Sequence, residues 1–463
     1  MPKQKLKMSS MPVVNTYAAG IDVGSRTHYV ATGQEAGQVR SFGVYQADLL
    51  KLSRWLKEER VITVAMESTG SYWKGLFQQL QADGFEVILV NGKHTRNVKG
   101  KKTDVLDCQW IQRLHSLGLL SGSFLPDDAT DVLRQYVRQR EHLIDYGSAY
   151  IKKMQQALRL MNIRLDVALS DITGLSGRTV IKAILGGERN PEILASLVDR
   201  RVKKSKEEIA LSLQGNWREE YLFELKMSYE LYEVFKQKER ECEACIERLL
   251  DDYIRKVVAE TNPNQNSKET VRKAQKKKNK NAPQMDLQSK CILLTHGINL
   301  YQIEGVSDSA VLTLLSETGL DLRKFPTAKH FSSWLALSPN NKKSGNRVIS
   351  SHIAHHKNRL AKALRMAANA VGHCKEGRLA QFFKRIAYKY GRKAAITATA
   401  RKLAVIIWNM LTKHQPYRYE DSAIYTEKIR RLQLKNIQRK INALNISDGE
   451  LNLLPPQTQM VPK

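Results

Sequence analysis

Four acidic residues lie where an α/β protein could gather them at one site. Asp22 follows a short apolar run in GIDVGS, and Glu67 follows another in VAMESTG. Asp104 and Asp107 lie three residues apart in KKTDVLDCQW, a spacing that puts both on one face at the start of a helix. Because the carboxyl ends of neighbouring strands converge at one edge of an open sheet, we expect the four side chains to form one cluster.

Such a cluster would repel itself unless cations hold it together. Carboxylates packed without partners protonate or separate, whereas divalent ions take oxygen ligands readily. Two ions roughly 4 Å apart would stabilise the attacking and leaving oxygens of an in-line phosphoryl displacement. Mg²⁺ is the expected ion, and Mn²⁺ suits the same ligands. Taken one by one, each acid also fits a turn or a helix N-cap, so the interpretation depends on their joint placement.

The segment that leads into the acidic pair is strongly basic. NGKHTRNVKGKK contains no acid, and we predict that its cations contact nucleic acid: Lys93, Arg96, Lys99, Lys101 and Lys102. A run of charge is most often only a solvated surface. One that leads directly into a carboxylate pair suits a phosphate backbone that approaches bound metal ions.

The composition of the whole chain also indicates a polyanionic partner. The 463 residues include 75 Lys and Arg against 46 Asp and Glu, a formal net charge of +29. Self-repulsion of that size favours a protein that works on nucleic acid, and 42% hydrophobic residues suffice for several cores. The N-terminus lacks the apolar core of a signal peptide, and no apolar run approaches the ~20 residues that span a bilayer. We therefore expect a cytoplasmic protein without membrane contact.

The elements that must position the acids follow from hydrophobic periodicity. Residues 16–91 are predicted as three strands, a helix, a strand, a helix and a strand, and a further helix runs from about Thr103 to Leu117. This order fits a mixed α/β sheet of the ribonuclease H (RuvC-like) type. We assign residues 15–128 to this catalytic domain and residues 1–14 to a disordered N-terminus.

Two long amphipathic helices are predicted in the next segment, residues 129–261. The first runs from about Thr130 to Leu160 and has an arginine-rich face, and the second runs from about Glu219 to Val258. Apolar residues of the second helix approximate an a/d seam, which fits equally a coiled coil between protomers and an intramolecular hairpin with the first helix. Cys242 and Cys245 form a lone C-x-x-C there, which we interpret as a helix face rather than a metal site.

The remainder of the chain divides into a linker, a domain and a tail. Residues 262–287 are polar and basic and are interpreted as a flexible linker or insertion. A mostly helical domain is predicted at 288–420, followed by a tail at 421–463. Within the 288–420 domain, the IEGVSDSA segment fits two structures. One is a helix-hairpin-helix turn that offers backbone N–H groups to phosphate, and the other is an ordinary helix connection.

The second half of this C-terminal domain is predicted to have a nucleic-acid surface. Residues 355–413 contain 14 Lys and Arg and one acid, Glu376, beside small and apolar packing residues. His352, His355 and His356 are interpreted as phosphate contacts or solvent-exposed residues rather than metal ligands.

The chain resembles one known family in two separate sets of motifs. The first set is GIDVGSRTHYV, MESTGSYW and VNGKHTRNVKGKKTDVLDCQWIQRL; the second is IEGVSDSAVLTLLSETG, FPTAKHFSSWLALSPNNKKSGNRV and KNRLAKALRMAA. Both resemble the DEDD-type insertion-sequence transposases (family one-ten), which are related to the Piv-type DNA invertases and are bridge-RNA-guided recombinases. The resemblance carries the family's Asp-Glu-Asp-Asp set onto Asp22, Glu67, Asp104 and Asp107.

The resemblance also implies a serine nucleophile. The family's S-G step matches Ser344 and Gly345, which implies that Ser344 attacks a DNA phosphodiester and forms a phosphoserine link. From the residues alone, this serine fits a turn in a basic loop. In the same motifs we predict nucleic-acid contacts at Lys342, Lys343, Arg347, Arg359 and Arg365.

The resulting hypothesis is a transposase that cuts and rejoins DNA strands at an insertion-sequence element. Its partners would be donor and target double-stranded DNA, a guide (bridge) RNA, and further copies of the chain in a dimer or tetramer. The guide RNA is implied by the resemblance alone. The alternatives are a metal-dependent junction-resolving nuclease, an RNA-independent DNA invertase, and a non-enzymatic nucleic-acid-binding protein whose acids merely cap turns.

Overall fold

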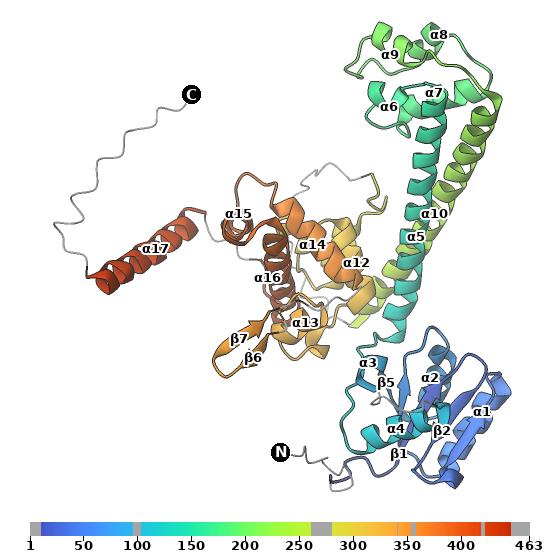
Figure 1. Cartoon of the computed structure of the whole chain (residues 1–463). Helices are drawn as coiled ribbons and strands as arrows, with labels where there is room; N and C mark the ends of the chain where they lie inside the picture. Colours follow the sequence, from blue (N-terminus) through green and yellow to red (C-terminus); the bar gives the residue numbers. More distant parts are fainter. Residues whose placement is uncertain are drawn as a thin grey trace. The chain divides into compact units, whose positions relative to one another are not determined.

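The computed structural model describes residues 11–95, 103–260, 280–339, 341–351, 353, 358–417 and 422–445. The chain divides into two compact units, Met1–Leu125 and Pro126–Lys463 (Figure 1).

A five-stranded mixed sheet forms the centre of the first unit. Its strands are β1 (Ala18–Val23), β2 (His28–Ala31), β3 (Val39–Phe42), β4 (Thr63–Glu67) and β5 (Glu86–Val90). They lie in the order β3-β2-β1-β4-β5; the first three pair antiparallel, and β1, β4 and β5 pair parallel. The mixed α/β sheet predicted from the sequence is confirmed.

Helices cover both faces of this sheet. Two of them, α1 (Gln46–Glu58) and α2 (Trp73–Ala82), share a core with every second residue of the strands, including Ile21 and Met66. The opposite face receives α4 (Asp104–Ser116), whose Gln112 side chain donates to the Ala18 carbonyl on β1. Two short elements complete the unit, η2 (Ala36–Gln38) and α3 (Gly92–Thr95).

The second unit begins with a helical hairpin, the arm. Its helices are α5 (Asp128–Leu160) and α10 (Glu219–Glu260), which pack against each other within the chain. The ring of Phe235 lies 5.5 Å from both Tyr146 and Tyr150, and the Cys242 thiol donates to the Tyr136 carbonyl. Of the two interpretations of the apolar seam, the structure therefore shows the intramolecular hairpin, and coiled-coil pairing of protomers stays a prediction.

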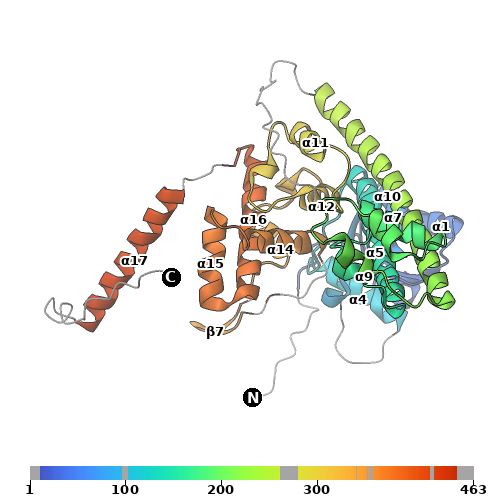
Figure 2. The ribbon, with the colours of Figure 1, turned by 90° about the horizontal axis from the view of Figure 1, so that it is seen from above.

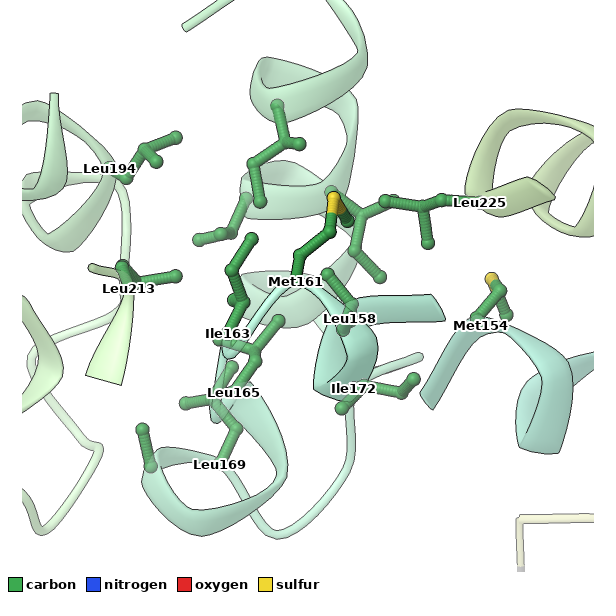
Figure 3. Packing of buried hydrophobic residues seen from close by; sticks show 14 of the residues in the cluster. Met154, Leu158, Met161, Ile163, Leu165, Leu169, Ile172, Leu194, Leu213 and Leu225 are labelled. Carbon is green, nitrogen blue, oxygen red and sulfur yellow. The ribbon is translucent and has the colours of Figure 1, made fainter. Parts of the chain in front are cut away.

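Four short helices close the far end of the arm and share a core with it. They are α6 (Leu165–Ala168), α7 (Leu175–Leu185), α8 (Pro191–Ser196) and α9 (Lys206–Ser212). Figure 3 shows Met154 and Leu158 of α5, Leu225 of α10, and Leu194 and Leu213 of the tip converging on one apolar cluster. The two long helices were predicted from the sequence, whereas this tip was not.

The C-terminal part of the second unit is mostly helical, with one small β-hairpin. Its elements are α11 (Leu287–Leu294), η4 (Leu300–Gln302), α12 (Asp308–Thr318), η5 (Leu322–Lys324), α13 (Ala328–Trp334), β6 (Lys342–Ser344), β7 (Arg347–Ser350), α14 (Arg359–Val371), α15 (Arg378–Tyr390) and α16 (Arg392–Lys413). A further helix, α17 (Ser422–Leu444), lies where the sequence analysis expected only a tail.

The long helix α16 is central to this domain. It packs against α13, α14 and α15, and Figure 2 shows α15 and α16 running side by side. Among the helices that the structure describes, α16 alone is long and apolar enough, by length and composition, to cross a membrane. Its Ala395, Leu403 and Ile407 are buried against neighbouring helices, which is the pattern of a core helix.

Candidate catalytic sites

Asp22 and Glu67 lie at the carboxyl ends of neighbouring parallel strands, on the same face of the sheet. β1 and β4 pair in register up to Ile21 opposite Met66, so Asp22 and Glu67 are the next residue on each strand. Parallel strands lie about 4.8 Å apart, and their residues alternate between the faces. Because Ile21 and Met66 belong to the core under α1 and α2, Asp22 and Glu67 point to the face that α4 covers.

The first turn of α4 lies at the same edge of the sheet. Near its far end, His115 Nε2 lies 3.0 Å from the Thr63 hydroxyl at the start of β4. In its middle, Cys108 and Gln112 lie against Gly20 of β1, so α4 runs antiparallel to the strands. Thr103 caps its N-terminus by accepting from the Leu106 N–H at 3.3 Å. Asp104 and Asp107 therefore lie at the carboxyl ends of β1 and β4.

The buried Cys108 thiol lies within electrostatic range of two of the carboxylates. Burial, followed by the negative charges of Asp22 and Asp107, raises the pKa of the Cys108 thiol to about 12. The Cys108 thiol thus interacts electrostatically with Asp22 of β1 and with Asp107 of α4. Since the thiol stays neutral, it adds no charge to this edge of the sheet.

The predicted cluster of four is not closed in this structure. Within the described ranges, no three His, Cys, Asp or Glu side chains lie close enough together to hold a metal ion. Glu67 Oε2 accepts from the Thr95 hydroxyl at 2.7 Å, which turns its carboxylate toward α3, and Asp104 is exposed on the first turn of α4. The side chains thus share an edge and a face without converging on one point.

The donor set itself fits a divalent cation. Carboxylate oxygens are the ligands that Mg²⁺ and Mn²⁺ prefer, and Asp22 and Glu67 in register on adjacent strands offer two of them on one face. Asp107 lies beside the same thiol as Asp22.

Ser344 lies at the tip of the β-hairpin in the second unit. It is the last residue of β6, pairs with Arg347 of β7, and is followed by Gly345 at φ 54°. A glycine with positive φ at the first position of a two-residue connection is typical of a type II′ hairpin turn. Both Ser344 and Arg347 are exposed. The basic turn expected from the residues is therefore the end of a strand pair that presents the hydroxyl to solvent.

The predicted nucleic-acid contacts fall into three groups. Lys342 is exposed beside Ser344, whereas the backbone of Lys343 lies in β6 and that of Lys93 lies in α3. Arg359 forms an ion pair with Glu141 of α5, and Arg365 donates to the Ala336 carbonyl at 3.3 Å. These two arginines thus also hold the domain together. Outside the described residues lie Arg96, Lys99, Lys101, Lys102, His352, His355 and His356.

Arginines on α5 bind the arm to the C-terminal domain, a role that the sequence analysis missed. Arg138 donates two hydrogen bonds, of 2.9 and 2.8 Å, to the Glu317 carboxylate at the end of α12. Arg134 donates to the Ser316 and Glu317 carbonyls, which α12 leaves without helical partners. The feature of the sequence that could have indicated this role is the arginine-rich face of the first long helix.

The IEGVSDSA segment forms a packed turn. Gly305 has φ 81°, and a Cβ there would lie 2.5 Å from the Ala367 carbonyl of α14. The preceding residue, Glu304, accepts from the Leu379 N–H at 3.0 Å and so caps α15. Both contacts lie inside the domain, which favours the ordinary helix connection over a phosphate-binding turn.

The fold and these sites define a nucleic-acid enzyme with a ribonuclease-H-like sheet and a separate helical domain. Residues 19–163 match a family model for DEDD transposases, described as "Transposase", and residues 298–384 match the "Transposase IS116/IS110/IS902 family". The chain belongs to this family of insertion-sequence transposases, which cut and rejoin DNA, and its DEDD domain implies a divalent metal ion. A comparison with curated proteins gave no match.

Proposed function

We propose that this transposase cuts DNA with Ser344 as the nucleophile and rejoins it by the reverse step. The observation that carries this assignment is the position of Ser344, exposed at the end of β6 and opposite Arg347. Directly opposite residues of an antiparallel pair project from the same face, with Cβ atoms about 5 Å apart. A guanidinium beside the hydroxyl would hold a phosphate by two hydrogen bonds in reach of the serine oxygen.

The proposed step exchanges one phosphate ester for another. The Ser344 oxygen forms a bond to phosphorus, the bond from phosphorus to a deoxyribose oxygen breaks, and that oxygen takes up the serine proton. The bond energy is kept in the phosphoserine, so a second deoxyribose hydroxyl can reverse the step and join a new strand. Because a serine hydroxyl is a weak nucleophile, it needs a neighbouring group that activates it.

In the first unit, we propose that Asp22, Glu67, Asp104 and Asp107 bind Mg²⁺ or Mn²⁺. Their common edge and face, described above, support this assignment. When bound there, a divalent cation stabilises charge on phosphate oxygens as a Lewis acid. The chain's own contribution is to orient the ligands: Thr95 holds Glu67, and Thr103 begins the helix that presents Asp107.

Further parts of the proposal come from the family resemblance and the charge. A guide RNA that pairs with donor and target DNA would choose the sites, since a basic protein recognises such a duplex mainly through its backbone and shape. We also propose that the enzyme works in the cytoplasm as a dimer or tetramer, with residues 15–128 as the catalytic domain, 129–261 as the arm and 288–420 as the serine domain.

The test is a strand-transfer assay with purified protein, its co-purifying RNA, Mg²⁺ and labelled DNA that contains the element's ends. Ser344→Ala should abolish both the protein–DNA adduct on denaturing gels and the joined product. Ser350→Ala, at the base of the same hairpin, is the matched control and should keep both. Asp107→Asn should lose joining, whereas Glu58→Gln, an exposed acid at the end of α1, should not.

A particular result would favour the rival enzyme. If Ser344→Ala still cuts while Asp107→Asn is inactive, the covalent step is wrong and the protein is a metal-dependent nuclease. Calorimetric titration with Mn²⁺ tests the metal site without activity, since Asp107→Asn should weaken binding and Glu58→Gln should leave it unchanged. Retained joining after removal of the RNA would contradict the guide.

A further inference from the structure

A cationic surface with exposed tyrosines covers α15 and the start of α16. Tyr388 is 97% exposed and Tyr390 is 62% exposed, although both belong to a helix that packs against the core of its domain. Between Lys375 and Lys402 the chain has nine Lys and Arg and a single acid, Glu376. No step of the proposed reaction uses this surface.

The cations around Tyr388 are available for a partner. Lys384, Arg385 and Lys389 are exposed, and none forms an ion pair with an acid in the described part of the chain. Lys384 and Arg385 precede Tyr388 by four and three residues and so share its helix face. Lys384 Nζ donates to the Lys375 carbonyl at 2.8 Å. Within the described residues, this face of α15 therefore has a positive charge around Tyr388 that no acid pairs with.

Other tyrosines of the same unit are used differently. Tyr301 is half-buried, and its hydroxyl donates to Asp308 Oδ1 at 2.7 Å. Tyr146 is exposed but lies against the ring of Phe235 at 5.5 Å. Tyr388 has no ring or cation against it among the residues that the structure describes. Both faces of its ring are thus open to solvent.

An open aromatic ring among cations that have no acidic partner in the described residues matches the chemistry of unpaired nucleotides. Every base offers a face on which an aromatic side chain stacks, while the backbone phosphates need cations. Duplex DNA offers the phosphates but keeps its base faces stacked inside, so it would leave Tyr388 without a role. A transposase that transfers one DNA strand at a time separates that strand from its complement.

We propose that the α15–α16 surface binds single-stranded DNA, with Tyr388 stacking on an unpaired base and Lys384, Arg385 and Lys389 contacting phosphates. This inference relies on the transposase activity and not on the assignment of Ser344. The surface would hold a strand that has been separated from its duplex, a task distinct from cutting.

The test measures binding by the full chain, so its result is independent of the nucleophile. Fluorescence anisotropy compares a labelled oligothymidylate with a duplex of the same length. Tyr388→Ala should weaken single-strand binding roughly 5- to 100-fold, the effect of losing one base–aromatic stack, and change duplex binding less than about twofold. Tyr388→Phe keeps the ring and should bind like the wild type, because the hydroxyl is not needed for stacking.

The salt dependence of binding distinguishes phosphate contacts from base stacking. Lys384→Gln should reduce the slope of log affinity against log salt by about 1, whereas Tyr388→Ala should leave that slope unchanged. Tyr45→Ala removes another exposed tyrosine, in the first unit, and is the control that should have no effect. Equal single-strand affinity of Tyr388→Ala and wild type would overturn the proposal. So would a loss confined to an oligouridylate RNA of the same length, since the strand bound would then be RNA.

Discussion

Gly20 sets the distance between the strand that carries Asp22 and the helix that carries Asp104 and Asp107. A Cβ at this position would lie 2.1 Å from the Gln112 backbone nitrogen and 2.6 Å from the Cys108 carbonyl oxygen. Ordinary contacts begin near 3.4 Å, so Gly20→Ala has to push α4 away from β1 by about 1 Å. Backbone atoms cannot rotate aside as a side chain can.

Two effects should follow from that displacement. Overpacking of this kind costs typically 1–3 kcal/mol of folding stability. A misplacement of about 1 Å at a catalytic group can cost roughly 100-fold in rate. We therefore expect Gly20→Ala to lose about two orders of magnitude in strand transfer while it still folds.

The measurement pairs cleavage rates with melting temperatures for two variants. Gly75→Ala is the control, because its Cβ would meet only Leu49 Cδ1 at 3.9 Å and an alanine favours the helix by up to about 1 kcal/mol. Its rate should match the wild type. If Gly20→Ala keeps both its rate and its melting temperature, the contact of α4 with β1 does not position Asp104 and Asp107 relative to Asp22.

Three further predictions concern other parts of the molecule. Arg140 is 5% exposed and donates to Glu243 at 2.7 Å, so Arg140→Met should destabilise the arm by roughly 3 kcal/mol and speed amide exchange in α5 and α10 about 100-fold. The exposed Arg240→Met should change exchange little, and equal effects of both would contradict this. Burial lowers the pKa of His115 to about 4, below its ordinary 6.5. Because the unfolded chain then binds a proton more readily than the folded one, the folding stability of the first unit should fall by up to roughly 3 kcal/mol as the pH drops from about 6.5 to 4. His115→Gln should flatten that fall in a melting curve series; an unchanged slope would exclude His115 as its source. Gly345→Val should strain the turn at φ 54° by about 1–2 kcal/mol and reduce strand transfer without reducing DNA binding.

The sheet of the first unit was predictable because its strands are short apolar runs bounded by turn residues. Ile21 and Met66 are buried on one face, and Asp22 and Glu67 follow them on the other. Strand ends and helix starts are local signals, so the common edge of the acids follows from sequence. The contact of Thr95 with Glu67 does not follow, because it depends on a side-chain rotamer chosen by tertiary packing.

Other features gave weak or ambiguous signals. An a/d seam has the same period whether its partner is another copy or α5, so the sequence alone could not choose the hairpin. The strands β6 and β7 are too short, and Lys342 and Ser344 too poor as strand formers, to be predicted. The arginine-rich face of α5 was visible in the sequence, but its role was not, because the partner of Arg138 is Glu317, which lies far away in the sequence.

The length of the arm and the rotation of its tip are coupled, because each added helical residue changes both. The 33 residues of α5 rise about 50 Å, and the tip is attached through Met154 and Leu225 at the far end. Adding seven residues to both helices would extend the tip by about 10 Å and rotate it only about 20°. Adding three or four would rotate it much further for a smaller gain. Relatives with longer or shorter arms should therefore differ by multiples of seven residues in each helix. Such changes alter the length of the arm and nearly preserve the orientation of its tip.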